Sequence, residues 1–251
     1  VPMAFPLQNC ELNYTLTPLK FIDLSGLAPT LAEAAEIAAH VYRIDEEAMK
    51  DELPGGWKRI EYYNRDTLQM GVYSREKEDG TMEYVVSNAG TREILDWAQN
   101  IKQPFGSSED MINSIKYATY FVEKYSDSEI TFVGHSKGGA EAAGNALATN
   151  KNAILFNPAS INAYAYDLDV SKYTADMTAY IVKGEILNNI FGLISRPIDK
   201  MVYLPTQYSV NTPIEELNLV NSVRNHSMSA VKEAIKEWEE PKEKKWGPKW
   251  W

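Results

Sequence analysis

One stretch near the middle of the chain constrains its fold more than any other. Apolar and β-branched residues at 130–133 lead into Gly134-His135-Ser136-Lys137-Gly138, and an alanine-rich segment follows at 140–148. This order predicts a strand, a sharp turn and a helix, which is the context of a nucleophile elbow. We expect Gly134 and Gly138 to be required, because a Cβ there would collide with the neighbouring strand or helix. The serine hydroxyl would then stand clear of the sheet, at the positive end of a helix.

The remainder of the chain predicts strands and helices arranged around this turn. From about residue 84 onward the two kinds of segment alternate, which indicates a parallel sheet covered by helices on both faces. Before residue 84 short polar turns separate the strand-like runs, which indicates an antiparallel meander. The fold class is therefore α/β with a mostly parallel central sheet. Expected strands are 58–63, 69–74, 83–87, 130–133, 153–156, 177–182 and 200–204; expected helices are 30–42, 92–103, 109–125, 140–148 and most of 213–240, interrupted near Asn225-His226.

The two ends of the chain carry weaker signals. Residues 1–27 show no clear period, so we expect an irregular segment followed by a single domain that ends near residue 240. The tail 241–251 is rich in tryptophan and lysine. That pairing suits a membrane interface. The alternatives are a packed or disordered end, or a linker cut from a longer protein.

Charge and cysteine content exclude several classes of function. The net charge of −10 argues against nucleic acid as a partner and against attraction to anionic membranes, but not against neutral or zwitterionic lipid. No apolar run approaches the ~20 residues of a membrane span, so we expect a soluble protein. Cys10 is the only cysteine, which leaves the compartment open, secretion included. No metal-ligand spacing is present, and we expect no metal and no cofactor.

A serine nucleophile needs a general base and an acid that orients it. Hydrolases with this type of elbow carry them in the order serine, acid, histidine. His135 belongs to the elbow and should point away from the serine, and His40 precedes it and is expected at the surface or at its boundary. His226 is the histidine that lies downstream. We therefore predict Ser136 as the nucleophile and His226 as the base.

The acid should follow a strand end between the serine and the histidine. Glu185 comes after the strand 177–182 and Gly184, and it fits best. Asp199, which precedes a strand, and Asp169 are the alternatives. An oxyanion hole needs two N–H donors. We expect one from Lys137, directly after the nucleophile, and one from Thr91, after Gly90 at the end of an earlier strand.

Three motifs together carry a family resemblance. The run Val85-Val86-Ser87-Asn88-Ala89-Gly90-Thr91, the pair Asp96-Trp97 and the run Gly134-His135-Ser136-Lys137-Gly138-Gly139-Ala140 resemble the landmarks of class 3 lipase-like α/β hydrolases. The likeness covers roughly residues 55–230 and is greatest to a bacterial branch with GHSKGG at the elbow. It implies an α/β-hydrolase fold and hydrolysis of the carboxylic esters of lipids, as by a lipase or a phospholipase A, without metal or organic cofactor.

The resemblance assigns the same roles to the same residues, with two departures. The family commonly has arginine where this chain has Ala89, and aspartate where Glu185 would act. Ser136 would be the nucleophile, His226 the base, and Thr91 and Lys137 the oxyanion donors, acting on a lipid or lipid-like ester with transient contact to a membrane surface. The alternatives are a small-ester or thioester hydrolase with the same triad, and a decayed hydrolase fold used for binding lipid or a partner.

Overall fold

The computed structural model describes residues 29–91, 108–187 and 200–240, and the observations below concern these residues. Eight strands form one sheet in which each strand lies beside its neighbours in the chain. Their bounds are β1 Glu52–Leu53, β2 Trp57–Arg65, β3 Leu68–Glu76, β4 Met82–Asn88, β5 Glu129–His135, β6 Asn152–Phe156, β7 Met177–Val182 and β8 Lys200–Leu204. The expected α/β class is confirmed.

The pairing between neighbouring strands changes once across the sheet, from antiparallel to parallel. From β1 to β4, neighbouring strands pair antiparallel, as predicted from the short turns between the expected strands. β4 to β8 run parallel, because each connection between them is long enough to cross the sheet and return. The carboxyl ends of the five parallel strands therefore share one edge, where α/β proteins commonly place their sites.

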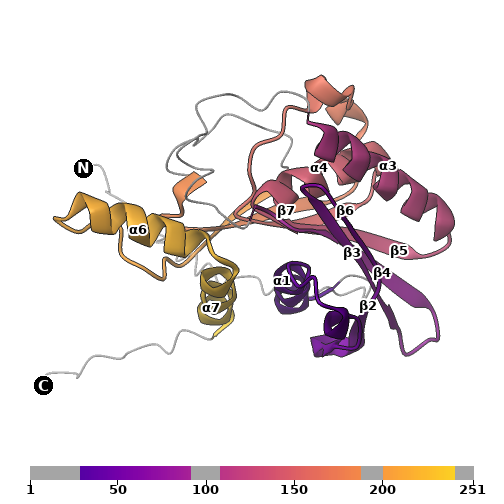
Figure 1. Cartoon of the computed structure of the whole chain (residues 1–251), viewed down its shortest axis with the longest axis horizontal. Helices are drawn as coiled ribbons and strands as arrows, with labels where there is room; N and C mark the ends of the chain where they lie inside the picture. Colours follow the sequence, from indigo (N-terminus) through magenta and orange to yellow (C-terminus); the bar gives the residue numbers. More distant parts are fainter. Residues whose placement is uncertain (1–28, 92–107, 188–199, 241–251) are drawn as a thin grey trace, which may run out of the picture.

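Helices cover both faces of the sheet, as expected (Figure 1). α3 (Glu109–Lys124) and α4 (Lys137–Thr149) pack on one face; α1 (Leu31–His40) and α7 (Met228–Glu239) pack on the other. Successive strand residues serve opposite faces: Val86 and Phe132 join the core under α3 and α4, whereas Val85 and Val133 join the core under α1 and α7. Four short 3₁₀ helices complete the described elements: η1 Glu46–Met49, η2 Pro54–Gly56, η3 Ala163–Tyr166 and η4 Val170–Lys172.

Side-chain caps fix where the helices begin. The predicted capping box of α1 is present: the Glu33 N–H donates to Thr30 Oγ1 at 3.2 Å, and the Thr30 N–H donates to Glu33 Oε2 at 2.9 Å. Ser108 caps α3 by accepting the Met111 N–H at 3.2 Å. The expected helix 92–103, the irregular segment 1–27 and the tail 241–251 lie outside the described residues. No helix in the described ranges is long and apolar enough to cross a membrane.

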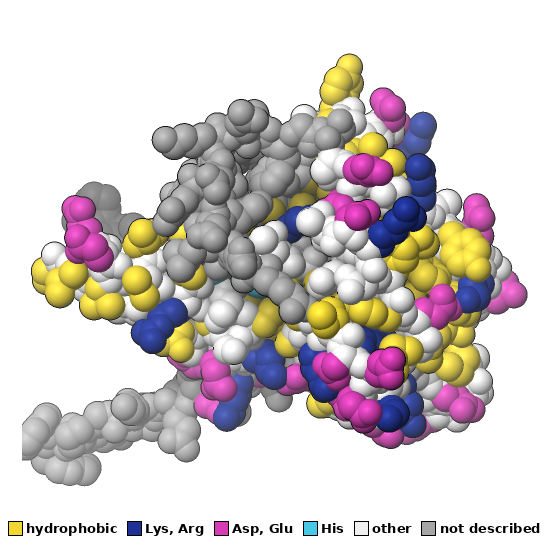
Figure 2. Space-filling view, in the orientation of Figure 1, with side chains coloured by type: hydrophobic (Ala, Val, Ile, Leu, Met, Phe, Trp, Pro, Cys, Tyr) yellow, Lys and Arg dark blue, Asp and Glu magenta, His cyan; other side chains and the backbone are white. Residues whose placement is uncertain are grey.

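The helix α6 (Glu215–His226) is amphipathic with its polar side facing the protein and its apolar side facing outward. Its inner side is polar: Asn218, Asn221 and Asn225 each bind backbone groups of the loop 206–212, at 2.7–3.1 Å. Its outer side is apolar, with the exposed side chains Leu217, Leu219 and Val220 (Figure 2). α6 ends at the predicted interruption, and Ser227 then caps α7 through the Ala230 N–H.

Candidate active site

The residues 134–138 form the predicted sharp turn between β5 and α4. Ser136 has φ 58° and ψ −126°, a backbone conformation that non-glycine residues adopt where structure imposes it. A Cβ on Gly134 would lie 2.1 Å from the Gly138 carbonyl oxygen, and one on Gly138 would lie 2.2 Å from the Asn88 carbonyl oxygen. The expected need for both glycines is confirmed. The turn holds a fully buried serine at the start of α4.

A histidine and a glutamate meet at the same edge of the sheet. His226, the last residue of α6, is 1% exposed, and its Nδ1 lies 2.7 Å from Glu185 Oε2. Glu185 follows β7 through Gly184, and its Oε2 also accepts the Leu187 N–H at 2.9 Å. Because a carboxylate only accepts, Nδ1 donates to Glu185, and in a neutral imidazole Nε2 is then the nitrogen with the lone pair. The structure thus pairs the two residues predicted as base and acid.

Two atoms of this group have no hydrogen-bond partner among the described residues. They are Ser136 Oγ and His226 Nε2, and both are buried. Buried polar atoms are almost always paired. The serine hydroxyl and the imidazole are therefore not hydrogen-bonded to each other in this structure, and such bonds between catalytic groups are often long or poorly aligned until a substrate binds.

The two alternative acids, Asp169 and Asp199, are not described in contact with His226. Asp169 caps η4, where it accepts the Ser171 N–H at 3.1 Å, and it forms an ion pair with Lys172 at 3.3 Å near the surface. It has no described contact with His226. Asp199 lies outside the described residues. Glu185 therefore remains the acid that fits best.

Asn157 holds the backbone at the end of α6. It follows β6 with φ 39°. Its Nδ2 donates to the carbonyls of Asn225 and His226 at 3.1 and 3.2 Å, and its Oδ1 accepts the Val182 N–H at 2.8 Å. Sequence reasoning missed this role. The available signal was the Asn-Pro pair directly after a buried strand.

The loop after β4 lies against the elbow. A Cβ on Gly90 would come within 2.6 Å of the His135 carbonyl oxygen and 2.8 Å of Ser136 Cβ. The Gly90 N–H donates to the Tyr42 hydroxyl at 2.8 Å, so Thr91 is the next donor along this loop. Lys137 is the first residue of α4, and a first-turn N–H has no partner within its helix. The two predicted oxyanion donors, Lys137 and Thr91, therefore directly follow Ser136 and Gly90, which pack against each other at the elbow.

The side chain of Lys137 points into a second polar group, which we term the α4 cluster. The Lys137 ammonium binds Asp110 at 2.6 Å, the Thr67 carbonyl at 3.0 Å and Glu141 at 3.3 Å. Burial raises the pKa of Glu141 to about 7, although Lys137 and Asn88 favour its ionised form. Asn88, Ser114 and Asn145 complete the cluster through four hydrogen bonds of 2.9–3.1 Å among themselves and to Glu141.

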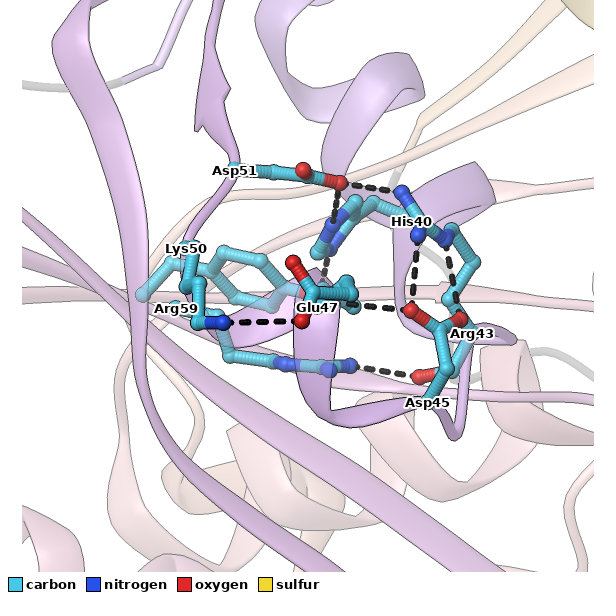
Figure 3. Close-up of polar contacts among 9 residues, drawn as sticks. His40, Arg43, Asp45, Glu47, Lys50, Asp51 and Arg59 are labelled. Atoms are coloured by element: carbon cyan, nitrogen blue, oxygen red, sulfur yellow. Dashed lines mark hydrogen bonds and ion pairs between the residues drawn. The ribbon is translucent and has the colours of Figure 1, made fainter.

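The expectation that His40 lies at the surface or its boundary is wrong. His40 is 7% exposed, with Nδ1 at 3.0 Å from the Tyr73 hydroxyl and Nε2 at 3.3 Å from Asp51. Arg43 also pairs with Asp51 (Figure 3). Burial lowers the pKa of His40. These contacts tie the end of α1 to β3, and none of those described involves Ser136, Glu185 or His226.

Fold and site together define the class: an α/β hydrolase of the lipase type. The chain belongs to the phospholipase-like family of Tle-like phospholipase domains, whose profile matches residues 33–215. That match contains the elbow and Glu185 and ends before His226.

Individual relatives agree with this assignment. The chain is 27% identical over 188 residues to the extracellular phospholipase A1 of Serratia liquefaciens, covering 65% of this chain and 57% of that protein. The chain thus spans little more than half the length of this relative. In fold it is similar to the Rhizomucor miehei triacylglyceride lipase (TM-score 0.51, 14% identity, 64% of this chain, 73% of that one). It is also similar to the native lipase–propeptide complex of that organism (TM-score 0.50, 13% identity, 64% and 62%).

Proposed function

We propose that this chain is a serine hydrolase that cleaves the acyl ester of a phospholipid. One observation carries the proposal. The His226–Glu185 pair, 2.7 Å apart, is buried with Ser136 at one edge of the sheet, and the serine Oγ and the imidazole Nε2 are unpaired among the described residues.

In the first half-reaction the Ser136 oxygen attacks the ester carbonyl while His226 Nε2 takes its proton. Glu185 holds the imidazole by Nδ1 and stabilises its cationic form. The N–H groups of Lys137 and Thr91 bind the oxyanion, and the Thr91 hydroxyl is a further donor. The tetrahedral adduct then collapses: the bond to the leaving alcohol breaks, and the alcohol leaves with the proton that His226 returns. An acyl ester of Ser136 remains.

In the second half-reaction water takes the place of the alcohol. His226 accepts a proton from water as its oxygen attacks the acyl carbonyl, and the same N–H groups bind the charge. Collapse returns the proton to Ser136 and releases the fatty acid. No group beyond these side chains and water is needed to balance either step.

The two departures from the lipase pattern do not argue for a decayed site. Glu185 carries one methylene more than aspartate and still lies 2.7 Å from His226. Ala89 is buried and its N–H donates to the Gln69 carbonyl at 3.0 Å, so the loop after β4 is held without an arginine. Covalent labelling of Ser136 by a fluorophosphonate distinguishes an active site from a decayed one, since only an activated serine reacts readily.

For the substrate we propose the sn-1 ester of a phospholipid. The family is phospholipase-like, and the Serratia relative is called a phospholipase A1. Both favour a phospholipid over a triacylglycerol or a small ester, and the relative's name favours the sn-1 bond.

One vesicle experiment tests the proposed nucleophile, the proposed substrate class and the proposed ester bond. Vesicles of 1-palmitoyl-2-oleoyl-phosphatidylcholine doped with trilinolein are incubated with wild type and Ser136→Ala, and released acids are identified by mass. We expect palmitate from the wild type and none from the variant. Oleate would indicate the sn-2 bond and linoleate a triacylglycerol lipase. Release that persists in Ser136→Ala would exclude this serine as the nucleophile.

For transient contact with the lipid surface we propose the apolar side of α6. Its exposed side chains belong to the helix that ends in His226, and exposed apolar clusters commonly mark interaction sites. In flotation with phosphatidylcholine vesicles, Leu217→Ser/Val220→Ser should float less than the wild type. Ile112→Ser/Tyr120→Ser, which removes exposed apolar groups from α3, is the matched control. Equal flotation of both variants would exclude α6.

A further inference from the structure

We propose that Tyr42 and His135 are positioning residues, which fix the serine, the base and the loop after β4 relative to one another. This inference rests on the proposed function and adds two residues to it. Neither was expected to take part: Tyr42 follows α1, and His135 was predicted to point away from the serine.

His135 bridges two parts of the site through its ring nitrogens. Its Nε2 lies 2.6 Å from the backbone carbonyl oxygen of His226, and its Nδ1 lies 2.8 Å from the Tyr42 hydroxyl. The rings of His135 and His226 are also in contact, with centroids 4.8 Å apart. The residue next to the nucleophile in the chain therefore touches the base directly.

The chemistry of these groups fixes the direction of every hydrogen bond. A carbonyl oxygen only accepts, so His135 Nε2 must carry the proton. In a neutral ring Nδ1 must then accept, and the Tyr42 hydroxyl donates to it. The oxygen of Tyr42 in turn accepts the Gly90 N–H at 2.8 Å. The donors run one way, from Gly90 through Tyr42 and His135 to the carbonyl of His226.

Burial keeps this arrangement in a single protonation state. His135 is 6% exposed, and burial, together with His226, lowers the pKa of its ring to about 3. A protonated ring would present an N–H to Tyr42 where the network needs an acceptor. The neutral ring is therefore the form that fits, and it stays neutral across the working pH range of most hydrolases.

The chain of bonds joins the three parts that must act together. At one end Gly90 lies against Ser136 Cβ, and it immediately precedes Thr91. In the middle, His135 is joined covalently to Ser136. At the other end the carbonyl of His226 is held by His135 and, at 3.2 Å, by Asn157. Misplacement of reacting groups by about 1 Å can cost on the order of 100-fold in rate. Loss of these hydrogen bonds should therefore lower kcat.

The test compares two tyrosines that each bond a buried histidine. Tyr42→Phe removes the hydroxyl between Gly90 and His135. Tyr73→Phe removes the hydroxyl that bonds His40 at 3.0 Å, a bond with no described contact to the site, and serves as the matched control. For each variant the rate of fluorophosphonate labelling at Ser136, and kcat and KM for p-nitrophenyl butyrate, are measured per folded protein, with folding followed by circular dichroism.

We expect Tyr42→Phe to lower kcat and the labelling rate about 10-fold or more with KM little changed, and Tyr73→Phe to leave them near the wild-type values. A Tyr42→Phe variant that labels at the wild-type rate, or slows no more than Tyr73→Phe, overturns the proposal. A wild type that fluorophosphonate does not label overturns the proposed function itself, and the positioning role with it.

A second pair of variants tests His135. Glutamine can place an N–H near the position of Nε2, whereas leucine cannot, so His135→Gln should retain more of kcat than His135→Leu. The imidazole ¹⁵N shifts of the wild type give an independent readout. They should show His135 as the neutral Nε2–H tautomer at pH 7. An Nδ1–H tautomer, or equal rates for the glutamine and leucine variants, would contradict the assigned bonds.

Discussion

Two buried polar clusters flank the elbow, and they differ in how completely their atoms are paired. In the α4 cluster the side chains of Lys137, Glu141, Asn145, Asn88, Ser114 and Asp110 bind one another. Glu141 Oε1 has no hydrogen bond among the described residues, but it forms an ion pair with Lys137 at 3.3 Å. In the proposed catalytic cluster of Ser136, His226 and Glu185, two atoms, Ser136 Oγ and His226 Nε2, have no partner among the described residues. An unpaired buried polar atom costs about 1–3 kcal/mol. We therefore interpret the α4 cluster, whose members all contact one another, as a scaffold. The other cluster, with two atoms that have neither a hydrogen bond nor an ion pair among the described residues, is the proposed ligand site.

The two clusters each contain a buried glutamate, and the surroundings of these two side chains differ. Glu141 faces a lysine and an asparagine, yet burial raises its pKa to about 7. Glu185 faces an imidazole, which becomes cationic during the proposed reaction and then returns its proton. A glutamate thus belongs to a structural network in one place, and in the other it supports the imidazole that we propose transfers the proton.

The largest effect should come from removing the base. His226→Ala should lower kcat for p-nitrophenyl butyrate by about 10⁴-fold or more, because His226 is the proposed acceptor of the serine proton. Steady-state kinetics on folded protein checks this. A loss below tenfold would mean that another residue is the base.

The next effect separates the two glutamates directly. Glu185→Gln should lower kcat by about 10²–10⁴-fold, since an amide neither stabilises the imidazolium nor fixes its tautomer. Glu141→Gln, the matched exchange in the α4 cluster, should leave kcat within a few-fold of the wild type. Equal losses in both variants would remove the distinction between site and scaffold.

Glu141 should add a pH-dependent contribution to the stability of the wild type that Glu141→Gln lacks. Its folded-state pKa of about 7 lies above the ordinary 4.5, so the folded protein keeps a proton that the unfolded chain has lost. That stabilisation is full below pH 4.5 and is lost as the pH rises through 7. Between pH 5 and 8 the wild type should lose about 1–3 kcal/mol more than Glu141→Gln. Urea unfolding at both pH values measures the difference, and parallel curves would refute it.

The smallest effect is expected from Ser114→Ala, in the α4 cluster. It removes bonds of 2.9 and 3.0 Å to Asn88 and Asn145, which should cost about 1–3 kcal/mol of unfolding free energy. Because the cluster is scaffold, kcat measured well below the melting temperature should change little. A large loss of kcat in a stable Ser114→Ala variant would assign the α4 cluster to the site.

Local signals in the sequence were enough for most of the fold. The elbow, the strands β7 and β8 and the break after His226 were predicted at or near their observed positions, because apolar runs, glycines and caps act over a few residues. Chain order selected His226, and a position just after a strand end favoured Glu185 over Asp199 and Asp169; the structure brings His226 and Glu185 together.

Contacts between residues far apart in the chain were not predictable in the same way. His40 was misplaced because its partners, Asp51 and Tyr73, come from later elements. Glu141 and Asn145 looked like ordinary helix residues, and only the packing of α3 and β4 against α4 buries them. Tyr42 and Asn157 were missed because their roles depend on which loops meet at the sheet edge.

The sequential order of the strands bears on how the protein is made. Each strand pairs with the one synthesised just before it, so the sheet can grow strand by strand in the direction of translation. The nucleophile turn is complete once α4 has emerged, whereas His226 follows 90 residues after Ser136. A nascent chain therefore carries Ser136 long before it carries His226, so the proposed esterase activity would begin only after α6 has docked.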